Sequence, residues 1–162
     1  MSRSYFLINS LCLFLLLFSS CRIDQPCTYC GEYKNGGRTS EDSYQLLQIH
    51  CKKSGDILFY IEAGKGAPSY NSGSKYGMLT INKKNGHLQY LAQDTTEDCS
   101  LDFFFAKHEI VVTTITGECP FGNGVCADGT YNLKKKSNPT YFIDRKGKKI
   151  YFGETDPEHY EF

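Results

Sequence analysis

The residues of this chain best suited to chemistry by type and spacing are its cysteines. The sequence has eight of them, and an even number in an exported domain predicts disulfide bonds. We expect one bridge among Cys99, Cys119 and Cys126, because these three flank neighbouring predicted strands. Beyond the first 21 residues the candidates for disulfides are Cys27, Cys30, Cys51, Cys99, Cys119 and Cys126.

The pair Cys27 and Cys30 could instead form a redox or zinc site. A thioredoxin-like CxxC motif needs a strand before it and a helix after it, whereas Gly31 follows Cys30 here. A zinc site needs a second pair of cysteine or histidine ligands, and the spacing of Cys119 and Cys126 does not provide one. Structural disulfides are therefore preferred to zinc or redox chemistry.

The other ionisable residues form no catalytic pattern. The histidines are scattered, and the motifs HExxH, GxSxG, GxGxxG and the P-loop are absent from the sequence. Asp94, Glu97 and Asp98 could hold Ca²⁺, but they lack EF-hand spacing and a solvated turn is preferred. The net charge is zero, which gives no reason to bind nucleic acid. We predict a protein that is not an enzyme and has no metal or cofactor site.

Two glycine-rich segments are candidates for binding. Residues 64–75 (GKGAPSYNSGSK) and 119–129 (CPFGNGVCADG) both connect predicted strands. Long ordered loops often carry function, although glycine, serine and asparagine also serve turn geometry alone. Phe121, in the second segment, could anchor a partner, but a buried role in which it staples the loop is preferred.

Part of the first segment, Ser72-Gly73-Ser74-Lys75-Tyr76, resembles the SGxxY motif of the periplasmic and membrane-bound inhibitors of c-type lysozyme. The resemblance implies a small exported β-barrel, often a lipoprotein, with a loop that enters the lysozyme cleft. There the loop would engage the two carboxylates on which a retaining glycosidase depends. Ser72 and Tyr76 would then be contact residues, with Lys75 as a third. Alternatively, these residues form a turn that leads into a strand at Tyr76.

The first 20 residues have the pattern of a secretory signal. One cation, Arg3, precedes a mostly apolar stretch over residues 6–18. That stretch is too short and too interrupted to span a bilayer, which takes about 20 apolar residues. Phe18-Ser19-Ser20-Cys21 then resembles the lipobox of bacterial lipoproteins. Because Phe18 replaces an aliphatic residue, the resemblance is to the relaxed lipobox common in Bacteroidetes.

The lipobox resemblance implies that Cys21 is lipidated and becomes the mature N-terminus. Arg22 follows it, where an aspartate would mark inner-membrane retention, so we expect the protein in the outer membrane, facing the periplasm or the cell surface. A lipid anchor holds a protein to a membrane without spanning it. The alternative is ordinary signal cleavage, which leaves Cys21 as a spare thiol.

The rest of the chain alternates apolar and polar residues with a period of two, which is the pattern of β-strands. Asn85-Gly86 and Lys146-Gly147 each separate two such runs, as hairpin turns do. We predict an all-β fold, an antiparallel β-barrel or β-sandwich of about eight strands, stapled by disulfides. The candidate strands lie at residues 47–51, 57–63, 79–81, 88–92, 99–105, 109–116, 130–133, 141–144 and 149–152.

We expect a single β domain over residues 31–155. A signal peptide (1–20) and a lipid-anchored tether (21–30) precede it, and a loose acidic tail (156–162) follows it. Basic residues cluster at 134–136 and 145–149. They could contact anionic lipid or polysaccharide, but solubilising the hairpin ends is the preferred interpretation.

These patterns together favour a lipid-anchored envelope protein with a non-catalytic binding role. The expected partner is an envelope or host protein, such as a lysozyme-like hydrolase that it inhibits, or it acts as an immunity factor. The alternative is an accessory lipoprotein that binds glycan or a small apolar ligand in a barrel mouth. That alternative would depend on inward-facing aromatic residues such as Phe59 and Phe103.

Overall fold

The computed structural model describes residues 28–37, 41–81, 87–91, 99–117, 119 and 121–160. The predicted signal, Cys21, Cys27 and the acidic turn at 94–98 lie outside the described residues. Every strand reported below falls within them. A chain that begins at Arg22 therefore contains every strand that the structure describes.

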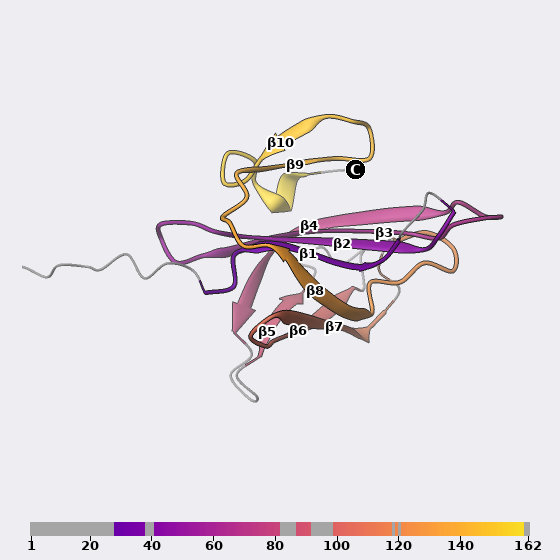
Figure 1. The fold of residues 1–162 in the computed structure, drawn as a ribbon. Helices are drawn as coiled ribbons and strands as arrows, with labels where there is room; N and C mark the ends of the chain where they lie inside the picture. Colours follow the sequence, from indigo (N-terminus) through magenta and orange to yellow (C-terminus); the bar gives the residue numbers. More distant parts are fainter. Residues whose placement is uncertain are drawn as a thin grey trace, which may run out of the picture.

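Eight antiparallel strands form a closed barrel in which each strand pairs with its neighbours in sequence (Figure 1). β8 returns to β1 and closes the barrel, with Tyr33 opposite Leu133. The all-β prediction is confirmed, and this closure decides for a barrel over a sandwich. The strands are β1 (Gly31–Gly36), β2 (Tyr44–Cys51), β3 (Ile57–Gly64), β4 (Ser72–Ile81), β5 (Leu88–Leu91), β6 (Ser100–Phe105), β7 (Glu109–Thr116) and β8 (Gly129–Lys135).

Two strand segments do not follow from the sequence pattern. β1 (GEYKNG) has one large apolar residue, Tyr33, and the first half of β4 is rich in glycine and serine, which are poor strand formers. Pairing with β3 holds β4 extended, in a register that runs from Ser72 opposite Gly64 to Leu79 opposite Ile57. The predicted loop at 64–75 is therefore shorter, at residues 65–71.

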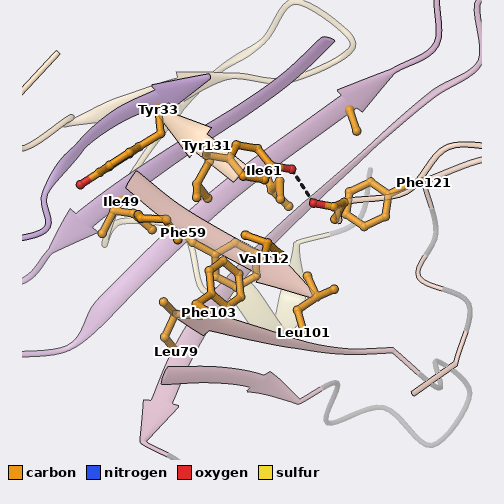
Figure 2. Packing of buried hydrophobic residues seen from close by; sticks show 14 of the residues in the cluster. Tyr33, Ile49, Phe59, Ile61, Leu79, Leu101, Phe103, Val112, Phe121 and Tyr131 are labelled. Atoms are coloured by element: carbon orange, nitrogen blue, oxygen red, sulfur yellow. Dashed lines mark hydrogen bonds between the residues drawn. The ribbon is translucent and has the colours of Figure 1, made fainter. Parts of the chain in front are cut away.

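Side chains fill the interior of the barrel, as Figure 2 shows. The Phe59 ring lies 5.0 Å from the ring of Phe103 and 5.3 Å from that of Tyr90. Gly77 allows this packing, because a Cβ there would lie 2.6 Å from Phe59 and 2.7 Å from Tyr90. An eight-stranded barrel is just wide enough for such a core. Phe59 and Phe103 do point inward, but they pack against each other and do not line a ligand chamber.

The predicted bridge among the last three cysteines is confirmed as Cys99–Cys119, with an S–S distance of 2.05 Å. It joins the entry to β6 with the segment after β7, at one end of the barrel. Cys30 and Cys51 are also disulfide-bonded. The inclusion of Cys126 among the disulfide candidates is wrong, because its thiol is free and exposed. Cys126 lies in the segment before β8, where its carbonyl accepts a hydrogen bond from Gln45.

A C-terminal hairpin forms a separate layer over the outer face of β3 and β4 (Figure 1). It comprises β9 (Tyr141–Ile143) and β10 (Lys149–Tyr151) and is followed by a short 3-10 helix, η1 (Pro157–His159). Tyr60 of β3 stacks on Phe142 of β9 with ring centroids 4.1 Å apart. The buried residues between the two layers are Leu58, Tyr60, Tyr76, Phe142, Ile150 and Phe152.

The prediction of a loose tail from residue 156 is wrong for its described part, 156–160. Tyr160 packs against the hairpin layer, and its hydroxyl donates to Asp144 at 2.7 Å. Asp144 also accepts from the backbone N–H groups of Lys146 and Lys148. Burial raises the pKa of Asp144, but the three hydrogen bonds outweigh it and hold that pKa below its ordinary value. An ionised Asp144 thus fixes both the hairpin turn and the tail.

Folding stability should fall as the pH drops below about 6.5, because of His50. Its ring stacks on Phe152 at 5.1 Å, and its Nδ1 donates to the Pro139 carbonyl at 2.8 Å. Burial lowers the pKa of His50 from 6.5; the Pro139 hydrogen bond opposes this shift and the charge of Lys52 adds to it. The unfolded chain therefore binds the proton more readily, so stability is complete above the unfolded pKa and is lost below it.

Urea unfolding at about pH 7 and about pH 5 tests this expectation. The loss of stability between the two should be smaller for His50→Gln than for the wild type. Equal losses in the two proteins would contradict it.

Candidate binding site at the loop end of the barrel

Three segments pack tightly at one end of the barrel, and we call residues 41–43, 65–71 and 121–128 the loop end. Two glycines allow this packing: a Cβ on Gly66 would overlap the carbonyl of Glu41, and one on Gly73 would overlap the backbone of Phe121. In the loop 65–71, the Ala67 N–H donates to the Glu41 carbonyl at 3.2 Å. The Lys65 N–H donates to the Asn71 carbonyl within the same loop at 2.8 Å. The loop end is therefore ordered by backbone contacts and does not need a partner to shape it.

The aromatic side chain that the loop end exposes is Tyr70. It is 60% exposed and has a φ of 49°. This left-handed backbone conformation costs a non-glycine residue about 1 kcal/mol or more. The Tyr70 N–H donates to the Gly66 carbonyl at 3.2 Å, and the next side chain, Asn71, donates to Asn123 at 2.9 Å. The surrounding loop thus holds Tyr70 in a strained position from which its ring points into solvent.

A cleft of about 270 Å³ opens beside this loop. Two of its lining residues form a hydrogen-bonded amide pair, in which Asn35 donates to Gln45 at 2.8 Å. Gln45 in turn donates to the carbonyls of Cys126 and Asp128 at 2.9 and 3.0 Å. The polar residues that line the cleft are Asn35, Ser43, Tyr44, Gln45, Lys65, Cys126 and Asp128.

Two ionisable side chains that line the cleft, Tyr44 and Asp128, form hydrogen bonds with neighbouring protein groups. The Tyr44 hydroxyl donates to Glu62 at 2.6 Å. Burial, together with the Glu62 hydrogen bond and charge, raises the pKa of Tyr44 to about 12, although Arg145 opposes the shift. Asp128 accepts from the backbone N–H and the hydroxyl of Thr114 at 2.8 and 2.6 Å. Among the described residues, no cluster of three or more His, Cys, Asp or Glu side chains could hold a metal ion.

The structure does not place the predicted contact residues on one surface. Ser72 is the first residue of β4 and lies half-buried beside the loop end. Lys75 belongs to the inward face of β4, with its Nζ 5.6 Å from the Tyr90 ring centroid. Tyr76 points the opposite way and is 1% exposed under the C-terminal hairpin. Residues 72–76 are thus a strand, and the placement of Tyr76 favours a structural role.

Phe121, the other predicted contact residue, closes the loop end from inside. It is 1% exposed and joins the barrel core (Figure 2). Its backbone lies against Gly73. Nearby, the buried Tyr131 hydroxyl donates to the Ala127 carbonyl at 2.7 Å. The buried alternative for Phe121 is therefore confirmed, and the interpretation as an exposed anchor is wrong. The reason is that Gly73 has no side chain to keep the Phe121 segment away.

Sequence reasoning did not single out Tyr44, Lys65 or Tyr70. Lys65 and Tyr70 both lie inside the first glycine-rich segment. The local signal for Tyr70 is weak, because a positive φ at tyrosine has no sequence signature. The cleft depends on residues from β1, β2 and β3 and from the loop before β8, so it exists only once the barrel has closed.

No protein-family model, curated protein or solved structure matches this chain. Within the described residues, no helix has the length and apolar character needed to cross a bilayer.

Proposed function

We propose that this chain is a lipid-anchored envelope protein that binds another protein without catalysis, and that the loop end is its binding face. The lipobox resemblance at Cys21 supports the anchor and the location. What carries the binding role is Tyr70, an exposed aromatic ring held at a positive φ by an ordered loop. Strain of this kind persists where the surrounding structure imposes it, and it is concentrated at functional positions.

The neighbours of Tyr70 fit a protein partner. Tyrosine is enriched among the residues that dominate protein interfaces, since it combines a large apolar surface with a hydroxyl. Lys65 and the partly exposed Tyr44 lie at the adjacent cleft, which supplies polar groups for the rim of an interface. Because the loop end is already ordered, binding would cost little conformational entropy.

A hydrolase of the lysozyme type is the first partner to test. Support for it comes from the resemblance of residues 72–76 to the SGxxY motif. Within that motif, Ser72 lies next to the loop end, whereas Tyr76 is buried. Inhibition of lytic activity by this protein, weakened by Ser72→Ala, would support the narrower inhibitor role. The broader binding role does not depend on this particular partner.

The test is capture of partners by the oxidised chain from Arg22 to Phe162, from purified c-type lysozyme and from an envelope extract. Tyr70→Gly should weaken binding by about 30-fold, which corresponds to the loss of a dominant interface residue of about 2 kcal/mol. The same change should leave stability equal or slightly higher, since glycine adopts a positive φ without strain. Tyr70→Phe is the matched control and should retain most of the affinity. Partner capture that is unchanged in Tyr70→Gly would contradict the proposal.

A further inference from the structure

The C-terminal hairpin has an outer face on which aromatic, aliphatic and basic side chains are exposed to solvent. Tyr141, Ile143, Lys149 and Tyr151 point away from the barrel, and we call them the outer hairpin face. Tyr141 pairs with Tyr151 across the hairpin, and Ile143 pairs with Lys149. Both tyrosines are 41% exposed and Ile143 is 48% exposed, whereas the alternate residues of the two strands are buried against β3 and β4. Figure 1 shows this hairpin as the layer farthest from β5, β6 and β7.

The outer hairpin face combines rings and a cation in one patch. The Tyr141 and Tyr151 ring centroids are 6.0 Å apart. The Lys149 Nζ lies 3.9 Å from the Tyr141 centroid and 4.9 Å from the Tyr151 centroid. Tyrosines with an apolar ring and a polar tip, next to a lysine, are typical of the membrane–water interface, where rings lie at headgroup level and ammonium groups reach phosphates.

The hairpin turn next to this face is strongly basic. Arg145, Lys146 and Lys148 are exposed there, directly before Lys149. The one acidic residue of the turn, Asp144, points inward and accepts the three hydrogen bonds described above. The acidic residues after β10 lie at the opposite end of the hairpin. The turn therefore presents positive charge that complements an anionic surface.

The hairpin also leaves the barrel where the described chain begins. Asn138 exchanges two hydrogen bonds with the backbone of Cys51, at 3.0 and 2.9 Å, just before β9. Gly31 lies opposite Ile49 in the adjacent strand, so the start of β1 is at the same barrel end. From Cys21 to Thr28 the chain can span at most about 25 Å. A lipid on Cys21 would hold this end of the barrel, which is the end opposite the basic turn, within that distance of the bilayer.

We propose that the outer hairpin face and the basic turn lie on an anionic phospholipid surface, with Tyr141 and Tyr151 at headgroup level and the turn cations on lipid phosphates. The contact is a second attachment, in addition to the lipid, and orients the barrel on its membrane. The placement next to the bilayer rests on the proposed anchor. The lipid-binding chemistry of the face does not, and it is measured without the anchor.

The first measurement is binding of the oxidised chain from Arg22 to Phe162, which lacks Cys21, to sedimented vesicles. Mixed phosphatidylcholine and phosphatidylglycerol vesicles should bind it, and pure phosphatidylcholine vesicles should bind it far more weakly. Lys146→Ala/Lys148→Ala should lower binding about 30-fold, because each surface cation contributes about fivefold. The control Lys34→Ala/Lys107→Ala makes the same change of charge on β1 and on the β6–β7 turn, and should have little effect.

The second measurement uses the absence of tryptophan from the whole chain. Tyr151→Trp introduces a single tryptophan on the outer hairpin face, and Phe104→Trp introduces one on the exposed face of β6 as a control. With anionic vesicles, the fluorescence of the Tyr151→Trp protein should shift to the blue and be quenched by brominated lipid. The fluorescence of the Phe104→Trp protein should show neither change.

Three results would overturn the inference: equal binding to neutral and anionic vesicles, equal loss of binding in the two lysine pairs, or an unshifted Tyr151→Trp emission. The anchor is tested separately, by incorporation of labelled fatty acid at Cys21 in cells, and the loop end is tested by Tyr70→Gly. Failure of the proposed function and failure of this inference therefore give different results.

Discussion

Replacing Tyr76 with alanine is expected to destabilise the protein by about 3–5 kcal/mol, as for other large buried aromatic side chains. The ring is 1% exposed and lies 5.1 Å from Phe142, 5.7 Å from Phe152 and 5.9 Å from Tyr160, measured between ring centroids. Its hydroxyl donates to the Thr155 carbonyl at 3.0 Å. Tyr76 is thus the residue of β4 that fastens both the hairpin and the tail to the barrel.

Urea unfolding measures the stability change, and limited proteolysis between residues 137 and 160 reports release of the hairpin. Tyr76→Phe keeps the ring and loses one hydrogen bond, so we expect a loss of only about 1 kcal/mol. Ser72→Ala, at the half-buried start of the same strand, should change stability by about 0.5 kcal/mol or less. A Tyr76→Ala protein as stable as the wild type would contradict the observed packing and would return Tyr76 to the set of contact residues.

The second large effect is expected at Phe121, where replacement with alanine should also cost about 3–5 kcal/mol. The ring joins the barrel core at the loop end, and its backbone touches Gly73. Its N–H donates to the Cys119 carbonyl at 2.7 Å, so the segment is tied to the disulfide on one side and to the core on the other. The cavity left by alanine cannot collapse easily between these two constraints.

The measurement is urea unfolding under oxidising conditions, with Phe104→Ala as a matched control. Phe104 is an exposed phenylalanine on β6, so its truncation should change stability by about 0.5 kcal/mol or less. Phe121→Leu should cost less than alanine, because it refills most of the volume. A Phe121→Ala protein that keeps its stability would mean that the ring is not part of the core.

Tyr76, just after the first glycine-rich segment, and Phe121, within the second, are both structural residues. The sequence makes both residues candidates for contact with a partner, yet both are buried, in two different cores. The residue left in solvent is Tyr70, within the first segment. A partner that binds the loop end should therefore tolerate Tyr76→Phe while it loses affinity for Tyr70→Gly.

The all-β class, most of the strands and the bridge involving Cys99 follow from the sequence alone. Alternating side chains point to opposite faces of a strand, so a period of two predicts β-structure without knowledge of the neighbours. Cys99 and Cys119 flank consecutive strands of an antiparallel pair, and such strands bring their outer ends together. These features are local, or they depend on adjacent strands only.

Tertiary structure alone decided that Tyr76 is buried and Cys126 is free, and it supplies the physical reason for the burial of Phe121 that the sequence favoured. Alternation places Tyr76 on the outer face of β4, where a side chain would be exposed, but a hairpin from much later in the chain covers it. Phe121 is buried because Gly73, on a distant strand, leaves room for its backbone. Cys126 stays free, since Cys99 pairs with Cys119 and the carbonyl of Cys126 is held at the cleft by Gln45. Each outcome depends on contacts between segments far apart in sequence, which local patterns of hydrophobicity and turn residues do not encode.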